Sequence, residues 1–125
     1  MADVVRKKSK IHGFGIFAAR DFKKGEIVLK WNPRELKKEQ VKGLSEGEKR
    51  YIAFLKGKIF LMQPPERFVN HSCDANTRAE NFCDVAKRDI KMGEEITANY
   101  SENMVPGERM ECNCGSKNCR KIIMA

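Results

Sequence analysis

The chain has 125 residues, which is near the commonest size of a single domain, and 41% of them are hydrophobic. With only four prolines, this composition excludes a largely disordered chain, and no apolar run approaches the roughly 18 residues that cross a membrane as a helix. The formal net charge is +8, and five cysteines without a signal-peptide core argue against a secreted disulfide framework.

The basic residues are concentrated in the first half of the chain. Residues 1–60 carry 16 Lys and Arg against 7 Asp and Glu, whereas residues 61–125 carry 9 against 10. The favoured interpretation of the basic half is a solvated lysine-rich surface, and the alternative is weak contact with nucleic acid or an acidic partner. We expect a soluble intracellular protein without membrane contact, cytoplasmic in a prokaryote and nuclear in a eukaryote.

Short strands are predicted at residues 4–5 and 16–19, on either side of a turn that contains glycine. The turn holds Gly13-Phe14-Gly15, where glycine lets the backbone take a positive φ and approach a ligand closely. An ordinary hairpin turn would explain the same two glycines.

A seven-residue phrase occurs twice in the chain. Residues 20–26 read RDFKKGE and residues 88–94 read RDIKMGE, so five of the seven positions are identical. Apolar residues follow each copy, and each therefore predicts a strand, a turn and a second strand. Two copies are too few for a solenoid, and they indicate two similar β units in one compact fold.

The middle of the chain is less regular. Asn32-Pro33 predicts the start of a short helix, and Ser45 with Glu48 has the spacing of a helix capping box. The apolar runs at residues 51–55 and 58–62 predict a β-hairpin. The alternative is a single helix from Ser45 to the end of the first run.

The most distinctive stretch is NHSCDAN at residues 70–76, which consists mainly of turn formers and side-chain hydrogen bonders. We expect it to form a polar loop that continues neither a helix nor a strand, anchored to a core by Phe68 and Val69. Beyond it, residues 77–79, 82–86 and 95–100 are predicted strands.

The cysteines near the C-terminus have metal-ligand spacing. Cys112, Cys114 and Cys119 form C-x-C-x4-C in a tail that has no hydrophobic periodicity. Three thiolates can wrap a tetrahedral ion, but a closed structural zinc site needs four ligands. The preferred fourth ligand is Cys73, which the polar loop presents on a turn; the alternatives are His71, Cys83 and His12. Such a site would fold the tail and hold it against the polar loop.

In this order and at this spacing, the motifs resemble those of a SET-domain protein lysine methyltransferase with a short post-SET zinc tail. The resemblance rests on four stretches: Gly13-Phe14-Gly15, residues 67–73 (RFVNHSC), residues 93–100 (GEEITANY) and the cysteine tail. It covers essentially the whole chain from residue 4. It implies a SET domain at residues 4–104 and a zinc-binding post-SET tail at residues 108–125.

The implied fold is mostly β, a SET fold (β-clip) of small curved sheets with short helices and a C-terminal pseudoknot. The implied cofactors are S-adenosylmethionine as methyl donor and one structural zinc ion, held by Cys73, Cys112, Cys114 and Cys119. The residues that match cofactor-binding positions are His12, Gly13, Phe14, Gly15, Arg67, Asn70, His71 and Tyr100. Tyr100 also matches the catalytic tyrosine. Tyr51 is the only other tyrosine in the chain, and we expect it at a second position on the channel or cofactor wall, with a packed core tyrosine as the alternative.

Lysine methylation places particular demands on these residues. The attacking amine must be neutral although free lysine has a pKa near 10.4, and burial beside a cation disfavours its charged form. Alignment then supplies most of the catalysis, and a tyrosine hydroxyl can hold a methyl group by weak C–H···O contacts. Ala98 stands where many family members carry Phe or Tyr, which predicts room for di- or trimethylation. Ala75 replaces the usual proline and should loosen the loop slightly.

Two other classes of function stay open at this point. One is a non-catalytic SET-fold module that binds zinc and cofactor for interaction, and the other is a nucleic-acid-binding protein that uses the basic half. The sequence lacks a recognisable platform of aromatic residues among the basic ones, which disfavours the latter. As an enzyme, the protein would act as a monomer or homodimer on a lysine of a histone or another DNA- or RNA-associated protein.

Overall fold

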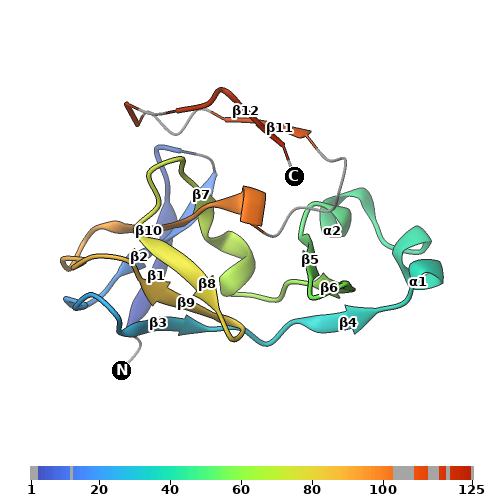
Figure 1. Ribbon diagram of the computed structural model, residues 1–125, viewed down its shortest axis with the longest axis horizontal. Helices are drawn as coiled ribbons and strands as arrows, with labels where there is room; N and C mark the ends of the chain where they lie inside the picture. The colour runs from blue at the N-terminus through green and yellow to red at the C-terminus, as the bar shows by residue number, and fades with distance from the viewer. Residues whose placement is uncertain (1–2, 12, 103–108, 113–115, 118, 125) are drawn as a thin grey trace.

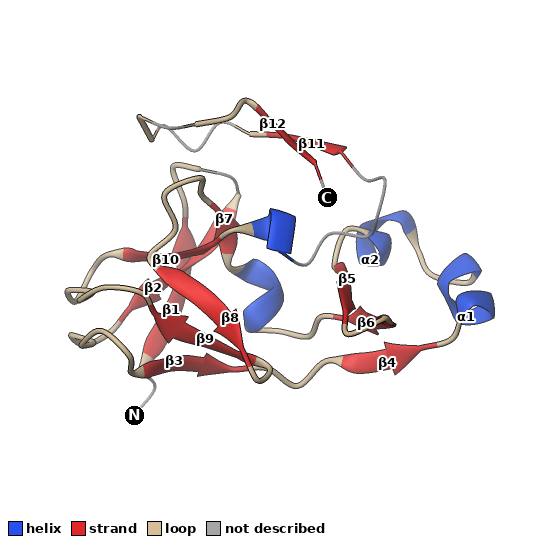
Figure 2. Cartoon of the chain, in the orientation of Figure 1, coloured by secondary structure: helices blue, strands red, loops and turns tan. Residues whose placement is uncertain are grey.

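The computed structural model describes residues 3–11, 13–102, 109–112, 116–117 and 119–124. Within these ranges the chain is mostly β-strand with few and short helices, as expected from the sequence (Figures 1 and 2). The strands are β1 (Val4–Lys8), β2 (Phe14–Ala18), β3 (Ile27–Lys30), β4 (Arg34–Leu36), β5 (Ile52–Leu55), β6 (Lys58–Leu61), β7 (Asn70–His71), β8 (Thr77–Glu80), β9 (Cys83–Ala86), β10 (Glu95–Ala98), β11 (Arg109–Glu111) and β12 (Ile122–Met124). The helices are α1 (Lys38–Lys42), α2 (Glu46–Lys49) and the 3₁₀ turns η1 (Glu66–Phe68) and η2 (Tyr100–Glu102).

The described strands form four small sheets. The largest has the order β1-β2-β10-β7, two three-stranded sheets have the orders β3-β9-β8 and β4-β6-β5, and β11 pairs with β12. All pairings are antiparallel except β7 with β10, which is parallel. In Figure 1 the hairpin β11–β12 lies over β7 and the turn that follows β10, and β12 contacts η2. The threading expected of a pseudoknot stays a prediction.

The core lies between the sheet β1-β2-β10-β7 and the sheet β3-β9-β8. Ile16 of β2 and Ile96 of β10 are fully buried neighbours in one sheet, and they pack with apolar residues from β3, β9 and the turns between them. Burying side chains of this size contributes about 1.5–3 kcal/mol each. The cluster consists of Ile16, Ala18, Phe22, Val28, Val69, Ala86, Ile90 and Ile96. Val69 places the start of the polar loop directly on this core, as the sequence indicated.

The two copies of the seven-residue phrase pair with each other. Phe22 and Ile90 exchange two backbone hydrogen bonds of 2.7 and 2.8 Å in an isolated antiparallel bridge. The carboxylate of each copy's aspartate accepts from a backbone N–H of the other copy's turn: Asp89 Oδ1 from the N–H of Lys24 and Asp21 Oδ1 from that of Met92, both at 2.8 Å. The sequence predicted two similar units, and the structure shows that they form one pseudo-symmetric clasp.

Both turns in this clasp need glycine. Gly25 has a φ of 91° and Gly93 a φ of 93°, a region that side chains disfavour. Each glycine N–H also donates to a carbonyl at 2.8 Å, Gly25 to Ala86 and Gly93 to Ala18. The matching geometry explains why the turn residues are alike in the two copies.

The middle of the chain confirms one sequence prediction and corrects two. The hairpin forms as β5 and β6, and Lys56 and Gly57 take positive φ values of 51° and 76° in its turn. Asn32-Pro33 does not start a helix: the next residues form β4, which pairs with β6, so sheet pairing overrides the local capping signal. The alternative helix from Ser45 is also wrong, since α2 ends at Lys49.

The capping signal at Ser45 is confirmed. Ser45 Oγ accepts from the backbone N–H of Glu48 at 3.2 Å, at the start of α2. The longest helix in the part of the chain that the structure describes has five residues, so none of these helices is long enough to span a membrane.

Asn70 and His71 correct the expectation of a plain loop. They form β7, with Asn70 opposite Thr97 and His71 opposite Ala98 in β10. Both side chains are buried although both are polar. Pairing to a distant strand was not visible in a local pattern of turn formers.

Replacing Asp89 tests the clasp. Asp89→Ala removes the acceptor for the N–H of Lys24, and we expect a loss of about 1 kcal/mol in the free energy of unfolding. Asp89→Asn is the matched control, because its amide oxygen can still accept this hydrogen bond. Urea denaturation of both variants measures the effect, and equal losses would show that the hydrogen bond is not the source of stability.

Candidate active site and metal centre

Three segments that are distant in the sequence meet beside β7. They are the glycine turn at residues 13–15, the stretch at residues 67–71 and Tyr100, which follows β10. Because β10 lies between β2 and β7 in one sheet, strand pairing brings all three to the same region (Figure 2). The candidate cofactor and catalytic residues of these segments are therefore neighbours in space.

The side chain of Asn70 joins the glycine turn to β10. Its Nδ2 donates to the carbonyl of Phe14 at 3.0 Å and to Glu95 Oε2 at 2.9 Å. Ser9 Oγ lies 2.7 and 2.8 Å from the two carboxylate oxygens of Glu95. A Cβ on Gly15 would overlap Glu95 Oε2, so the close approach of this carboxylate requires glycine.

Tyr100 is held at both ends by the stretch before the polar loop. Its backbone N–H donates to His71 Nδ1 at 2.9 Å, and its hydroxyl donates to the carbonyl of Val69. Burial raises the pKa of Tyr100 well above its usual range, and the negative charges of Asp84 and Glu95 also raise it. The hydroxyl is therefore neutral at physiological pH and can orient a group but not act as a general base.

Aromatic rings and arginines alternate next to this site. The guanidinium of Arg67 lies 4.5 Å from the ring centre of Tyr51, and its Nε donates to a backbone carbonyl at 2.9 Å. Arg6 lies between two further rings, 5.0 Å from the centre of Phe14 and 5.1 Å from that of Phe68. Phe14 is 49% exposed, so one aromatic face beside the glycine turn remains available to a ligand.

Three of the four cysteines assigned to zinc converge. The Sγ of Cys112 lies 3.9 Å from that of Cys73 and 3.7 Å from that of Cys119. A disulfide would place two sulfurs about 2.05 Å apart, so these pairs are not bonded. Tetrahedral zinc with Zn–S bonds of about 2.3 Å separates its sulfurs by about 3.8 Å. The observed spacing fits that donor set.

His71 lies between this cluster and Tyr100. Its Nδ1 accepts from the N–H of Tyr100, so the neutral ring carries its proton on Nε2, which lies 3.4 Å from Cys73 Sγ. Burial and, to a smaller extent, the charge of Arg120 together lower the pKa of His71 to about 4. His71, Cys73 and Cys112 form a group that could hold a metal ion. A protonated Nε2 suits a donor to a thiolate better than a ligand, which favours Cys73 as the fourth ligand.

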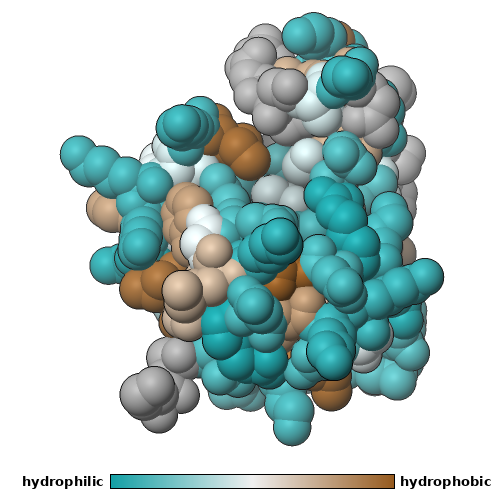
Figure 3. Space-filling model, turned by 90° about the vertical axis from the view of Figure 1, so that its left-hand side faces the viewer, coloured by the Kyte–Doolittle hydropathy of each residue, from teal (hydrophilic) through white to brown (hydrophobic). Residues whose placement is uncertain are grey.

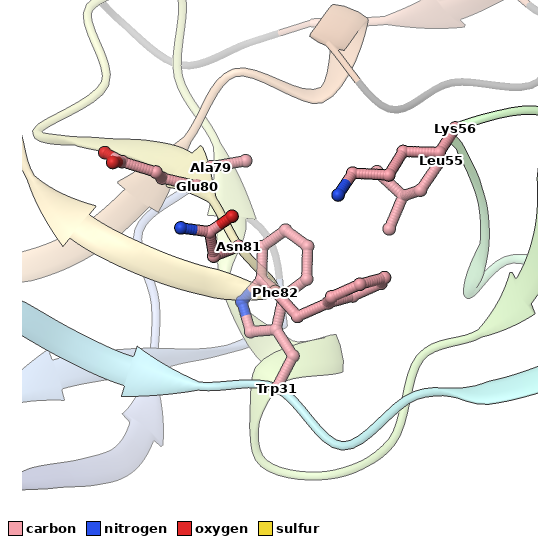
Figure 4. Close-up of a pocket in the computed structure, with 7 residues that line it drawn as sticks. All are labelled: Trp31, Leu55, Lys56, Ala79, Glu80, Asn81 and Phe82. Atoms are coloured by element: carbon pink, nitrogen blue, oxygen red, sulfur yellow. The ribbon is translucent and has the colours of Figure 1, made fainter.

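A separate hollow of about 230 Å³ lies between the turns of two hairpins (Figure 4). The rings of Trp31 and Phe82 form an edge-to-face pair on one side of it, and the amine of Lys56 lies 5.8 Å from the ring centre of Phe82. None of the candidate cofactor, catalytic or metal residues lines it. The lining residues are Trp31, Leu55, Lys56, Ala79, Glu80, Asn81 and Phe82.

The face of the molecule shown in Figure 3 is mainly hydrophilic. On the face shown in Figure 3, hydrophobic residues form small separate groups among charged and polar ones. In the part of the chain that the structure describes, the exposed large hydrophobic residues are Val5, Phe14, Ile27, Met92 and Ile122. This face therefore presents no broad apolar surface.

Two candidate residues, His12 and Cys114, lie outside the described residues. Cys83 lies on β9, where its Sγ contacts the carbonyl of Asn81, and it does not belong to the metal group found among the described residues. The proposed domain boundary also falls within residues 103–108, which the structure does not describe.

Sequence reasoning missed Ser9 and Glu95. Glu95 and Ile27 hold matching positions after the two copies of the phrase, and Ile27 is exposed. A charged residue at an exposed strand position needs no specific partner, so this comparison held no signal for Glu95. The partners, Ser9 and Asn70, could be identified only from the fold.

The chain is similar to known proteins over most of its length. The family profile described as SET domain matches residues 13–101. A solved structure of a Plasmodium falciparum protein, described as a candidate histone methyltransferase, superposes with a TM-score of 0.67 and 22% identity. That match covers 80% of this chain and 94% of the other. At this identity, the likeness establishes the fold.

Curated relatives match nearly the whole chain. The variant-silencing SET domain-containing protein of Plasmodium falciparum (isolate 3D7) is 32% identical, over 94% of this chain and 5% of the relative. Histone-lysine N-methyltransferase trr of Drosophila melanogaster is 30% identical, over 95% of this chain and 6% of the relative. Histone-lysine N-methyltransferase 2D of Homo sapiens is 30% identical, over 95% and 2%. The chain thus spans a few per cent of the length of these relatives.

Replacing Gly15 tests the contact around Glu95. In Gly15→Ala the new methyl group would displace the Glu95 carboxylate from Ser9 and Asn70, and we expect the loss of these hydrogen bonds to lower the free energy of unfolding by about 1–3 kcal/mol. Gly43→Ala is the matched control, since Gly43 has helical dihedrals and a Cβ there would lie 3.6 Å from its nearest atom. Denaturant titration of the two variants decides the matter: a Gly15→Ala variant as stable as Gly43→Ala would contradict the close approach.

Proposed function

The chain belongs to the SET-domain family, and we propose that it is a protein-lysine N-methyltransferase that uses S-adenosylmethionine. The names of relatives in this family support methyl transfer to lysine. Within the chain, the single observation that carries the proposal is Tyr100: a half-buried, neutral tyrosine whose hydroxyl and N–H are both fixed by residues 69–71. A tyrosine held at both ends in this way suits a catalytic residue that orients reacting groups.

The residues around the glycine turn fit the proposed cofactor. Gly13 has a φ of 43° with open space where a Cβ would lie, Phe14 offers an exposed ring, and Arg67 supplies a cation. The glycine backbone can approach a ligand closely, the ring of Phe14 can stack on an aromatic group, and the cation of Arg67 can pair with a carboxylate. S-adenosylmethionine would supply a methyl group on a sulfonium centre. We propose that Gly13 to Gly15, Arg67, Asn70, His71 and Tyr100 hold it, together with His12.

The structure of Tyr100 limits what it can contribute to the reaction. Its raised pKa keeps the phenol protonated, so it does not remove the proton from the substrate amine. Its hydroxyl proton is used by the carbonyl of Val69, which leaves the oxygen lone pairs to accept weak C–H contacts. Loss of the lysine proton would follow from burial of the amine, because desolvation lowers its pKa. Tyr51 would form a second wall of the same site.

We also propose that Cys73, Cys112, Cys114 and Cys119 bind one structural zinc ion. The sulfur separations support this donor set, and the backbone N–H of Arg120 donates to Cys73 Sγ at 3.3 Å, as expected for a thiolate acceptor. A closed four-thiolate site would stabilise the tail at residues 108–125 against the SET domain at residues 4–104. It would take no part in methyl transfer.

The proposed substrate is a lysine in a basic protein, such as a histone or another DNA- or RNA-associated protein. Relatives named histone-lysine N-methyltransferases support this class. Residues 61–125, which contain Tyr100, carry a near-neutral charge and would not repel a cationic substrate. Ala98 lies two residues before Tyr100, and we propose that its small side chain leaves room for more than one methyl group on the substrate amine. The proposed location is cytoplasmic in a prokaryote and nuclear in a eukaryote.

The first test replaces Tyr100. With methyl-labelled S-adenosylmethionine and core histones, Tyr100→Phe should reduce transfer to background, because the orienting oxygen is lost. Calorimetry should find that its affinity for S-adenosylmethionine and its fold are retained. Tyr51→Phe is the matched control and should reduce transfer less. Undiminished transfer by Tyr100→Phe would show that this residue has no catalytic role.

The wild type gives a second outcome. If it binds the cofactor but methylates neither histones nor cell-extract proteins, the result would indicate the non-catalytic module instead.

The second test concerns the metal. Cys119→Ser should lower the zinc content from about one ion per chain to nearly none, because one thiolate of a four-ligand site is lost. Cys83→Ser, which changes a cysteine outside the cluster, should keep its zinc. Metal analysis by mass spectrometry gives the result, and a wild-type protein purified without zinc would refute the proposed site. Removal of zinc should also weaken binding of S-adenosylmethionine, because His71 contacts both regions.

A further inference from the structure

Arg120 connects the tail to the turn that carries Tyr100. Its guanidinium Nη2 donates to Asn99 Oδ1 at 3.0 Å and lies 3.4 Å from Ser101 Oγ. Its backbone N–H donates to Cys73 Sγ. One residue of the tail therefore contacts both sequence neighbours of Tyr100 and one sulfur of the candidate metal centre.

Asn99 is the residue on which this connection depends. Its Oδ1 also accepts from the backbone N–H of Ser101 at 3.2 Å and from the hydroxyl of Ser101 at 2.7 Å. These bonds cap the 3₁₀ turn η2, whose first residue is Tyr100. A guanidinium donor is stronger than a neutral one and has a planar, preorganised shape, so Arg120 fixes the orientation of this amide.

The contacts described for the Arg120 side chain are hydrogen bonds to neutral groups. The ion pairs found among the described residues do not include it, and its side-chain partners are a neutral amide and a hydroxyl. Surface ion pairs contribute little to stability, but two hydrogen bonds from one guanidinium nitrogen to two flanking residues restrict the position of the residue between them. What lies between them is the candidate catalytic tyrosine.

We propose that Arg120 is a positioning residue for Tyr100. Residues 69–71 hold the hydroxyl and the N–H of this tyrosine, and Arg120 holds the turn from which its ring projects. The tail thus contributes to the active site through a side chain that is not a metal ligand. The expected effect on turnover rests on the proposed function. The expected effect on the position of Tyr100 rests on the contacts alone.

The structural consequence can be measured without any activity. The chain contains only two tyrosines, so incorporation of 3-fluorotyrosine gives two ¹⁹F signals, which Tyr51→Phe assigns. In zinc-containing protein, Arg120→Ala should shift or broaden the signal of Tyr100 and leave that of Tyr51 unchanged. Lys117→Ala, which removes an exposed cation from the same tail, is the matched control and should change neither. An unchanged Tyr100 signal in Arg120→Ala would overturn the proposal.

The catalytic consequence is a change in turnover. Arg120→Ala should lower kcat for methyl transfer to core histones about 10-fold, with the affinity for S-adenosylmethionine and the zinc content unchanged. Arg120→Lys should recover part of this loss, because its amine can donate to one of the two acceptors. Unchanged turnover, or loss of zinc from Arg120→Ala, would overturn a positioning role. If the wild type transfers no methyl group, the proposed function fails, and the ¹⁹F result still decides whether Arg120 positions Tyr100.

Discussion

The structure depends on a short run of residues, 69–71, whose polar groups each contact a different part of the molecule. The carbonyl of Val69 accepts from the hydroxyl of Tyr100, while its side chain is buried in the core. Asn70 donates to the glycine turn and to Glu95, and His71 contacts the N–H of Tyr100 and the sulfur of Cys73. Core, candidate cofactor site and candidate metal centre therefore share one segment of backbone.

This concentration of buried polar groups is stable because the groups satisfy one another. Among the described residues, every buried side-chain nitrogen and oxygen has a hydrogen-bond partner. Asn76 contributes to the same network, since its Nδ2 donates to the carbonyl of Glu95 and its Oδ1 accepts from the N–H of Thr97. Because these groups share hydrogen bonds, a single substitution here leaves several partners unsatisfied at once. Each unsatisfied buried polar group costs about 1–3 kcal/mol. That coupling is the physical reason to expect metal, cofactor and catalytic tyrosine to influence each other.

Sequence reasoning succeeded where the chemistry of a residue restricts its surroundings. Glycines at positive φ, the hairpin at Lys56-Gly57 and the cap at Ser45 follow from backbone preferences and are present in the structure. The spacing of Cys112 and Cys119 predicts a metal centre; their sulfurs lie 3.7 Å apart, and the metal itself stays a prediction. Predictions failed where a distant strand decided the outcome, as at Asn32-Pro33 and Asn70-His71, because local preferences are weaker than sheet pairing and burial.

By itself, the amino-acid sequence determined the two related turns, the hairpin between residues 51 and 62 and the polar and cysteine-rich segments, which follow from the residues' own conformational and chemical preferences. The mostly-β class and the roles of the candidate site residues came from the resemblance of its motifs to the SET family. Only the tertiary structure decided that the two turns clasp each other through Asp21 and Asp89, that Glu95 meets Ser9 and Asn70, and that Arg120 reaches the neighbours of Tyr100. Such contacts join residues up to 86 positions apart, and their geometry exists only once the sheets have paired.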